Sequence, residues 1–350
     1  MARCWMAVAL IVSAALLDLS PALADKPATV LDTAIGTTVT AIPIDFDRDN
    51  PDRKEFGKLI YRGGFNLFAK TRQFGGYSGL IVDKTGTRLL AISDGGTWMR
   101  ADFDYNGRKL AGLSNVTLGP ILDKNGKPLR SDLERDAESM TLAGGDINQG
   151  TALVGFERQH RILHYPFTPK SFGPPSGFVP LPPDAKSMRA NQGFEAVAEI
   201  SVGRLKGTLV AFSERLTDRN SNLKGWLIGG PSPGSITLKR IDGYDITDAA
   251  PLPDGGIVVL ERRFRMSEGV KMRVRRIAPS EIKRGALISG ETLLEAHDNL
   301  NIDNMEAIAA HRSAAGETVL TIMSDDNFSP LQRTLIMQFA LPGAQSAAAD

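Results

Sequence analysis

Short apolar runs bounded by turn residues recur along the whole chain, whereas long helical patterns are nearly absent. The run 89–92, for example, is long enough for one strand, and Ser93 and Asp94 follow it directly. Turn signals such as Asp-Lys-Thr-Gly at 83–86 and Pro-Asp-Gly-Gly at 253–256 separate neighbouring runs. This pattern predicts an all-β protein made of short strands joined by hairpins.

The predicted strands are grouped into a repeat. A first block, in which a Ser, Asp or Glu precedes a small residue and an apolar strand, occurs five times. Its third positions are Ser78, Glu138, Glu195, Asp248 and Glu306. A repeat of about 55 residues that holds about four strands is typical of a β-propeller blade. We therefore predict one five- or six-bladed β-propeller over residues 25–342. Residues 25–75 either close the ring with outer strands of the last blade or build most of a sixth blade.

A second block follows each copy of the first and consists of an apolar strand that ends in an acidic residue. The acids are Asp94, Glu157, Glu214, Glu261 and Asp325. Because the blades of a propeller are related by rotation, equivalent residues are expected to form rings around the channel. The two blocks together predict two neighbouring rings of carboxylates.

Closely spaced carboxylates repel one another, so the rings require positive charge between them. A hard cation such as calcium or magnesium takes oxygen ligands of this kind. Arginine is the alternative, because Arg158, Arg215 and Arg262 each follow a second-block acid directly. In that case acid and arginine would simply pair from blade to blade.

Charge and composition narrow the classes of function. The chain of 350 residues has 41 Lys and Arg against 40 Asp and Glu, so it lacks the strongly basic balance of a nucleic-acid-binding protein. Its content of 42% hydrophobic and 23% charged residues is that of a globular protein. A local basic hairpin over 262–276 predicts a solvated strand face.

The N-terminal residues 1–24 have the layout of a secretory signal peptide. Arg3 precedes an apolar run, and Ala22-Leu23-Ala24 forms a small-x-small cleavage site after Pro21. The single cysteine, Cys4, lies in this segment, so cleavage after Ala24 would leave no thiol nucleophile, zinc-thiolate site or disulfide. We expect a periplasmic or secreted monomer without a membrane anchor and with a flexible tail over 343–350.

Several motifs together resemble one family. They are Gly75-Gly76-Tyr77-Ser78-Gly79-Leu80, Gly193-Phe194-Glu195-Ala196-Val197, Val259-Leu260-Glu261-Arg262-Arg263-Phe264, Asp303-Asn304-Met305-Glu306-Ala307 and Ser324-Asp325-Asp326-Asn327-Phe328. In this order and spacing the chain resembles the bacterial phytase-like family, "esterase-like activity of phytase", over roughly residues 60–340. The resemblance implies a secreted β-propeller and a hydrolase of phosphate or other esters.

These observations lead to a first functional hypothesis, which is calcium-assisted hydrolysis of a phosphomonoester. The expected metal ligands are Glu138, Glu195, Glu306, Asp325 and Asp326, with Asp94, Glu157, Glu214, Asp248 and Glu261 as further candidates. Arg158, Arg215 and Arg262 are the expected clamp on the substrate phosphate. The alternatives are a non-enzymatic propeller that binds a ligand or partner and a hydrolase of carboxyl esters or lactones. The pattern assigns no catalytic nucleophile or base.

Overall fold

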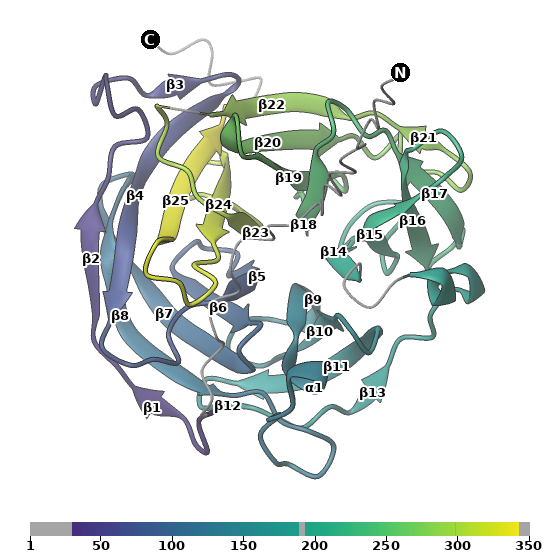
Figure 1. Cartoon of the computed structure of the whole chain (residues 1–350), viewed down its shortest axis with the longest axis horizontal. Helices are drawn as coiled ribbons and strands as arrows, with labels where there is room; N and C mark the ends of the chain where they lie inside the picture. The colour runs from purple at the N-terminus through teal and green to yellow at the C-terminus, as the bar shows by residue number, and fades with distance from the viewer. Residues whose placement is uncertain (1–29, 189–192, 298, 343–350) are drawn as a thin grey trace, which may run out of the picture.

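Five sheets stand around a central channel as the blades of a β-propeller (Figure 1). The structure is a computed structural model that describes residues 30–188, 193–297 and 299–342. The all-β propeller prediction is confirmed, and the number of blades is five. The predicted signal peptide over 1–24 and the predicted tail over 343–350 lie outside the described residues.

Each blade starts at its innermost strand, beside the channel. Blade 1 contains β5 (Tyr77–Val82), β6 (Arg88–Ser93), β7 (Thr97–Asn106), β8 (Lys109–Pro120) and β1 (Ile35–Gly36). Blade 2 contains β9 (Ala137–Gly145), β10 (Gly150–Phe156) and β11 (Arg161–Thr168), with β12 (Ser171–Phe172) and β13 (Gly177–Phe178) both paired to β11. Blade 3 contains β14 (Phe194–Glu199), β15 (Leu209–Thr217), β16 (Leu223–Ile228), β17 (Gly234–Leu238) and β21 (Leu287–Ile288).

The two remaining blades complete the ring. Blade 4 contains β18 (Asp245–Pro251), β19 (Ile257–Arg265), β20 (Gly269–Ile277) and β22 (Glu291–Ala296). Blade 5 contains β23 (Met305–Arg312), β24 (Thr318–Ser324), β25 (Thr334–Leu341), β4 (Leu59–Ala69) and β2 (Val39–Pro43), with β3 (Glu55–Phe56) paired to β4. The described helices are the single turns α1 (Asp132–Arg135) and η1 (Pro183–Ser187). Neither has the length or the apolar character to cross a bilayer.

The two ends of the chain meet in blade 5. Strand β4, near the N-terminus, pairs antiparallel with β25, near the C-terminus, and Phe65 lies opposite Ile336 (Figure 1). Strand β2 then pairs with the outer edge of β4. Hydrogen bonds between these distant segments close the ring, so that opening it would require breaking a sheet.

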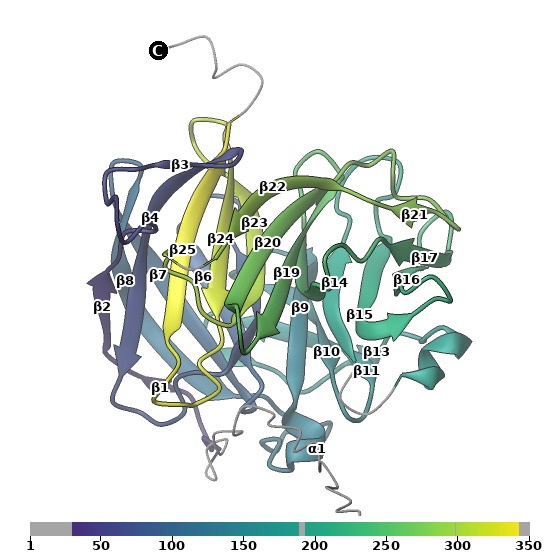
Figure 2. The ribbon, with the colours of Figure 1, turned by 45° about the horizontal axis from the view of Figure 1, so that its top comes forward.

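Neighbouring blades stand face to face around the channel (Figure 2). The described residues of the core form five apolar clusters, each of which lies between two neighbouring blades. Between blades 1 and 2, for example, Ile92 and Met140 share one cluster. Between blades 2 and 3, Leu153 packs with Trp226 in another. Both faces of each inner strand are therefore buried, which explains the nearly continuous apolar runs in the sequence.

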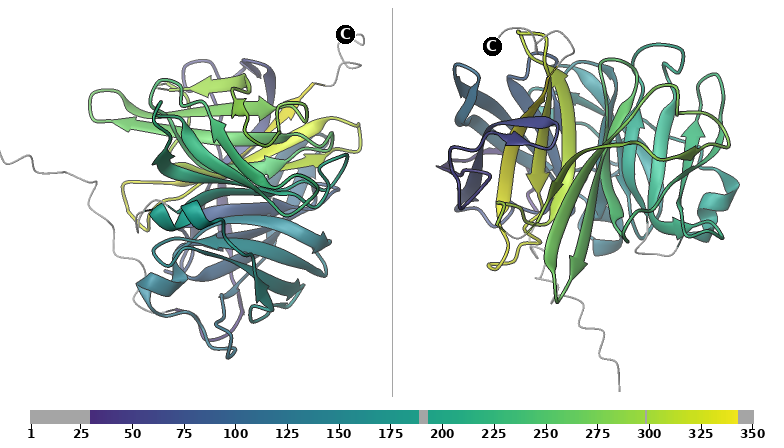
Figure 3. Two further views of the ribbon diagram at one scale, coloured as in Figure 1. Left: turned by 90° about the vertical axis from the view of Figure 1, so that its right-hand side faces the viewer. Right: turned by 90° about the horizontal axis from the view of Figure 1, so that it is seen from above.

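The basic hairpin formed by β19 and β20 extends beyond the neighbouring blades (Figure 3). At its tip Glu268 forms ion pairs with Arg263, Arg265 and Lys271. The prediction of a solvated strand face is wrong for Arg273 and Arg275, whose side chains are buried. Burial of these two arginines requires carboxylate partners, which are Glu261 for Arg275, and Glu295 and Asp242 for Arg273.

Candidate functional site

A β-bulge near the start of each inner strand places one side chain at the same mouth of the channel in every blade. The strand pairing skips one residue there, because two residues of the inner strand oppose one residue of its partner. The skipped residues, which we call the bulge positions, are Ser78, Glu138, Glu195, Thr247 and Glu306. The first-block prediction is therefore one residue off in blade 4, where Thr247 and not Asp248 occupies the bulge.

Asp248 instead has a structural role inside the wall of the channel. It is fully buried, and it accepts hydrogen bonds from the backbone N–H of Ala249 at 2.7 Å and of Ile308 at 2.8 Å. Because Ile308 lies on β23, this carboxylate joins blade 4 to blade 5. Burial raises the pKa of Asp248 well above its usual value, which disfavours a charged metal ligand here.

A second set of side chains lies where the second strand of each blade ends, and we call these the strand-end positions. In four blades the strand-end residue is acidic. Its backbone N–H donates a hydrogen bond to the carbonyl oxygen of the residue that lies two positions before the bulge position. The four acids are Asp94, Glu157, Glu214 and Asp325, with N···O distances of 2.9, 2.9, 3.2 and 2.9 Å. Bulge and strand-end positions together surround one end of the channel, which we call the acidic mouth.

Blade 4 departs from this rule. Asp245, two residues before the bulge, lies opposite Arg262, so the strand-end position carries an arginine. Glu261 is one residue earlier and its side chain points to the other face of the strand, as alternation in a strand requires. It is fully buried against Arg275, whose Nε lies 2.8 Å from Glu261 Oε2. Glu261 is therefore part of a buried ion pair and not of the acidic mouth.

Among the described residues, two clusters of three carboxylates form where one blade meets the next. The Asp94 cluster consists of Asp94, Asp136 and Glu138, and the Glu195 cluster consists of Glu157, Glu195 and Glu214. Within each cluster one ligand atom of every residue lies within 4.8 Å of those of the other two. Three oxygen donors at this spacing can hold a hard cation.

In the Glu195 cluster, burial and the proximity of several carboxylates raise the pKa of two of its members. Burial, followed by the charges of Glu157, Glu138 and Glu214, raises the pKa of Glu195 well above its usual value. Burial also raises the pKa of Glu214 to about 7, although the neighbouring Arg215 opposes this shift. The Arg215 Nη2 lies 3.1 Å from Glu214 Oε1. When the three carboxylates are ionised, they and Arg215 carry a net negative charge, which a divalent cation would offset.

The remaining predicted ligands lie on the blade 5 side of the mouth. Glu306 is paired with Arg262, and burial together with the charges of Asp94 and Glu306 raises the pKa of Asp325. Asp326 accepts hydrogen bonds from Gly76 N–H at 3.0 Å and from Phe328 N–H at 3.0 Å. These bonds fix the loop after β24 against blade 1, so Asp326 positions the loop.

The three predicted clamp arginines all reach the acidic mouth, and each is paired with a carboxylate. Arg158 contacts Asp136 within blade 2, with Nε and Oδ2 2.7 Å apart. Arg215 contacts Asp245 of the next blade at 3.2 Å, in addition to Glu214. Pairing of acids and arginines between blades therefore coexists with the two carboxylate clusters.

Asp136 is the functional candidate that the sequence pattern missed. It was visible as the residue before Ala137 in the second repeat, but its counterparts in the other blades are Gly76, Gly193, Asp245 and Asn304. Because only two of these five residues are acidic, the repeat does not indicate a conserved acidic position here, and the sequence pattern did not predict Asp136 as a ligand. Asp136 and Glu138, two residues apart, lie in one cluster with Asp94.

The fold and the mouth together define a five-bladed β-propeller with carboxylate clusters able to hold a metal ion at one end of its channel. A family model described as "Phytase-like: Esterase-like activity of phytase" matches residues 72–328, and the chain belongs to this family. No curated protein matches the chain.

Proposed function

We propose that this phytase-like propeller is a metal-assisted hydrolase that uses calcium to cleave a phosphomonoester at the acidic mouth. The observation that carries the proposal is the Glu195 cluster, with three carboxylates from two adjacent blades within reach of one ion. Family membership supports a hydrolase, and the all-oxygen donor set supports calcium among the metals. Residues 1–24 support a periplasmic or secreted location for the activity.

The donor atoms fit such an ion on electrostatic grounds. Glu195 has a raised pKa largely because it is buried beside other acids, so an ion bound there would favour its charged form. When bound, the cation would supply positive charge that acidifies a water molecule and neutralises phosphate oxygens. Glu157, Glu195 and Glu214 would hold it, and the Asp94 cluster offers a second place of the same chemistry.

The arginines of the mouth would orient the substrate. Arg262 and Arg215 are partly exposed, with side-chain exposures of 26% and 50%, so a phosphate group can reach their guanidinium groups. Planar guanidinium groups bind phosphate oxygens in pairs, which would fix the ester relative to the carboxylate clusters. Glu306 holds Arg262 in place before the substrate arrives.

The proposal is tested by calcium titration and by activity on paired substrates. Protein treated with EDTA is titrated with calcium in a calorimeter, and hydrolysis of p-nitrophenyl phosphate and p-nitrophenyl acetate is measured with and without calcium. We expect calcium-dependent cleavage of the phosphate ester and loss of calcium affinity of at least about tenfold in Glu195→Gln. Glu55→Gln, which changes an exposed acid on β3, serves as the control and should behave as the wild type.

The two alternatives give different results in this experiment. A hydrolase of carboxyl esters or lactones would cleave the acetate in preference to the phosphate. A propeller that only binds a ligand would take up calcium without turning over either ester. Absence of calcium binding together with phosphatase activity at background would disprove the proposed mechanism.

A further inference from the structure

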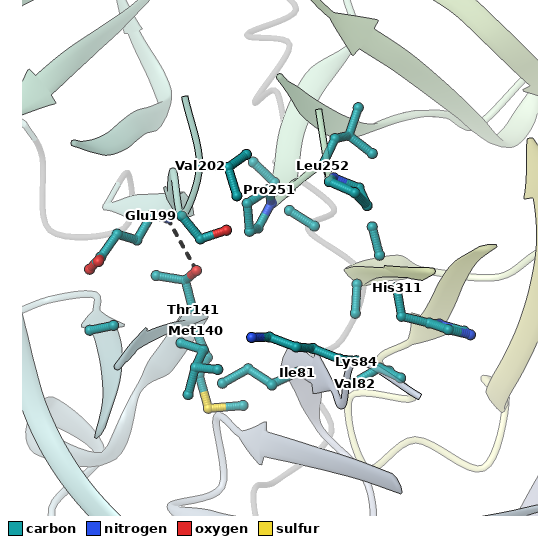
Figure 4. A pocket seen from close by; sticks show the side chains of 18 of the residues that line it. Ile81, Val82, Lys84, Met140, Thr141, Glu199, Val202, Pro251, Leu252 and His311 are labelled. Carbon is teal, nitrogen blue, oxygen red and sulfur yellow. Dashed lines mark hydrogen bonds between the residues drawn. The ribbon is translucent and has the colours of Figure 1, made fainter. Parts of the chain in front are cut away.

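A second cavity lies at the opposite mouth of the channel, where the inner strands end. Its volume is about 600 Å³, and residues from the ends of β5, β9, β14, β18 and β23 line it (Figure 4). Val82, at this end of β5, lies four positions along the strand from the bulge position Ser78, a rise of roughly 13 Å. The cavity is therefore a site separate from the carboxylate clusters.

Small side chains leave this end of the channel hollow. Ala249 and Ala250 on β18 and Ala309 and Ala310 on β23 line the cavity, where larger residues would fill it. The other lining side chains are mainly aliphatic, among them Val82, Met140, Val202 and Leu252. Among the described lining residues none is Phe, Tyr or Trp, so the cavity favours an aliphatic chain over a ring that would stack.

Positive charge gathers at the same cavity. Lys84, Lys206 and Arg312 line it, and all three are exposed. Within the part of the chain that the structure describes, none of the three forms an ion pair, whereas most arginines of the acidic mouth and of the basic hairpin do. In Figure 4 the Lys84 side chain extends across the cavity towards Thr141.

The other titratable groups do not cancel this charge. Glu199 is the one carboxylate among the described lining residues, and its side chain points away from the centre of the cavity (Figure 4). Its backbone N–H donates to Thr141 Oγ1 at 3.2 Å. His311 is buried, and burial lowers its pKa to about 4, so that it is neutral at physiological pH. The cavity thus combines an apolar interior with a cationic rim.

We propose that this cavity binds a straight-chain aliphatic carboxylate, with the alkyl chain among the small and aliphatic side chains and the carboxylate at Lys84. An apolar cavity supplies binding free energy in proportion to the apolar area that it covers, and a few polar groups fix the orientation of the ligand. Lys84, Lys206 and Arg312 supply those polar groups. This site is independent of calcium and of the hydrolysis proposed for the acidic mouth.

The probe for this test is decanoate, and decan-1-ol is the neutral ligand of equal length. Calorimetry with the wild-type protein should give saturable one-to-one binding of decanoate and weaker binding of decan-1-ol. Lys84→Met, which keeps the length of the side chain and removes its charge, should weaken decanoate binding about tenfold and leave decan-1-ol unchanged. Lys124→Met, in a surface turn outside the cavity, is the matched control.

Further variants identify the site and separate it from the acidic mouth. Lys206→Met should also weaken decanoate binding, and Val202→Trp, at an exposed position of the lining, should reduce binding of both ligands. EDTA and Glu195→Gln should have no effect, so the result does not depend on the proposed hydrolase activity. The inference is overturned if decanoate shows no saturable binding below about 1 mM, or if Lys84→Met and Lys206→Met both bind it as the wild type does.

Discussion

Arg262 of blade 4 lies beside Glu306 of blade 5, with its Nη2 atom 3.3 Å from Glu306 Oε1. Arg262 occupies the strand-end position, which is acidic in the other four blades. The acidic mouth is therefore asymmetric, since carboxylate clusters lie at the contacts of blades 1 to 3 and an arginine lies between blades 4 and 5.

The first prediction concerns Arg262 itself. Arg262→Gln should lower kcat/KM for p-nitrophenyl phosphate by about tenfold to a hundredfold, because it removes a charged contact with the phosphate. Its effect on the free energy of unfolding should stay at or below about 1 kcal/mol, since the ion pair is partly exposed. Steady-state kinetics and thermal unfolding measure the two effects.

Arg265→Gln is the control for this prediction, because Arg265 pairs with Glu268 at the exposed tip of the basic hairpin. It should retain wild-type kinetics. If Arg262→Gln hydrolysed the phosphate ester at the wild-type rate, Arg262 would have no part in substrate binding. Equal losses on phosphate and acetate esters would point to a general distortion of the mouth.

The repeat in the sequence was sufficient to predict the propeller but not the detailed register of its site. Spacing identifies blades because each blade is a separate strand group, and a shift of one residue leaves the spacing nearly unchanged. Such a shift decides which side chain reaches the mouth. In blade 4 the mouth holds Thr247 where Asp248 was predicted, and Arg262 where Glu261 was predicted. In both places residue type favoured the acid, whereas the bulge and the strand pairing placed its neighbour at the mouth.

The number of blades was open for a related reason. Residues 39–69 have the strand content of either an outer edge of the last blade or part of a sixth blade. Only the pairing of β4 with β25 decides between the two, and this pairing joins segments about 270 residues apart in the chain. Local patterns contain no information about such contacts.

The second prediction concerns the buried pair of Glu261 and Arg275. Both side chains are fully buried, and removal of Arg275 takes the hydrogen-bonded partner from the buried Glu261 carboxylate, leaving Arg273 at 3.9 Å as its remaining cation. Arg275→Met should lower the free energy of unfolding by about 3–5 kcal/mol. The double variant Glu261→Leu, Arg275→Met should recover much of this loss, since it also removes the buried carboxylate, while Arg273 keeps its ion pairs with Asp242 and Glu295. Chemical denaturation measures both values.

Lys271→Met provides the comparison, because Lys271 pairs with Glu268 in a partly exposed part of the same hairpin. Its cost should be below about 1 kcal/mol. A loss for Arg275→Met as small as that for Lys271→Met would show that the buried pair does not stabilise the fold. Failure of the double variant to recover stability would mean that packing dominates at this position.

The third prediction is a pH dependence of stability that calcium reverses. Burial beside other acids raises the pKa of Glu214 from 4.5 to about 7 and raises that of Glu195 well above its usual value. In this range the folded protein binds more protons than the unfolded chain, so the stability of the calcium-free protein should fall as pH rises from about 4.5 through 7. Calcium held at this cluster would bind the deprotonated carboxylates, so its stabilising effect should grow over the same range.

Glu199 allows a matched control, because burial raises its pKa to about 7 as well but at the opposite mouth. Melting temperatures are measured at pH 5 and pH 8 with EDTA or with calcium. Glu199→Gln should reduce the pH dependence and keep the response to calcium, whereas Glu214→Gln should reduce both. A wild-type protein that is more stable at pH 8 than at pH 5 in EDTA would contradict the proposed charge crowding.

The fourth prediction tests whether the backbone packs tightly against the acidic mouth at Gly76. This residue has φ of +68°, and a Cβ atom there would overlap the Asp94 carboxylate and lie 2.5 Å from Phe328 Cε2. Gly107 has nearly the same φ, +61°, but a Cβ atom there would meet nothing within 4 Å. Both Gly→Ala variants carry the backbone strain of about 1 kcal/mol, and Gly76→Ala adds the steric overlap.

Gly76→Ala should therefore unfold at a clearly lower denaturant concentration than Gly107→Ala. It should also bind calcium more weakly, because the Asp94 side chain must move. Equal stability of the two variants, with calcium affinity unchanged, would show that the mouth tolerates the added methyl group and that its geometry does not depend on this glycine.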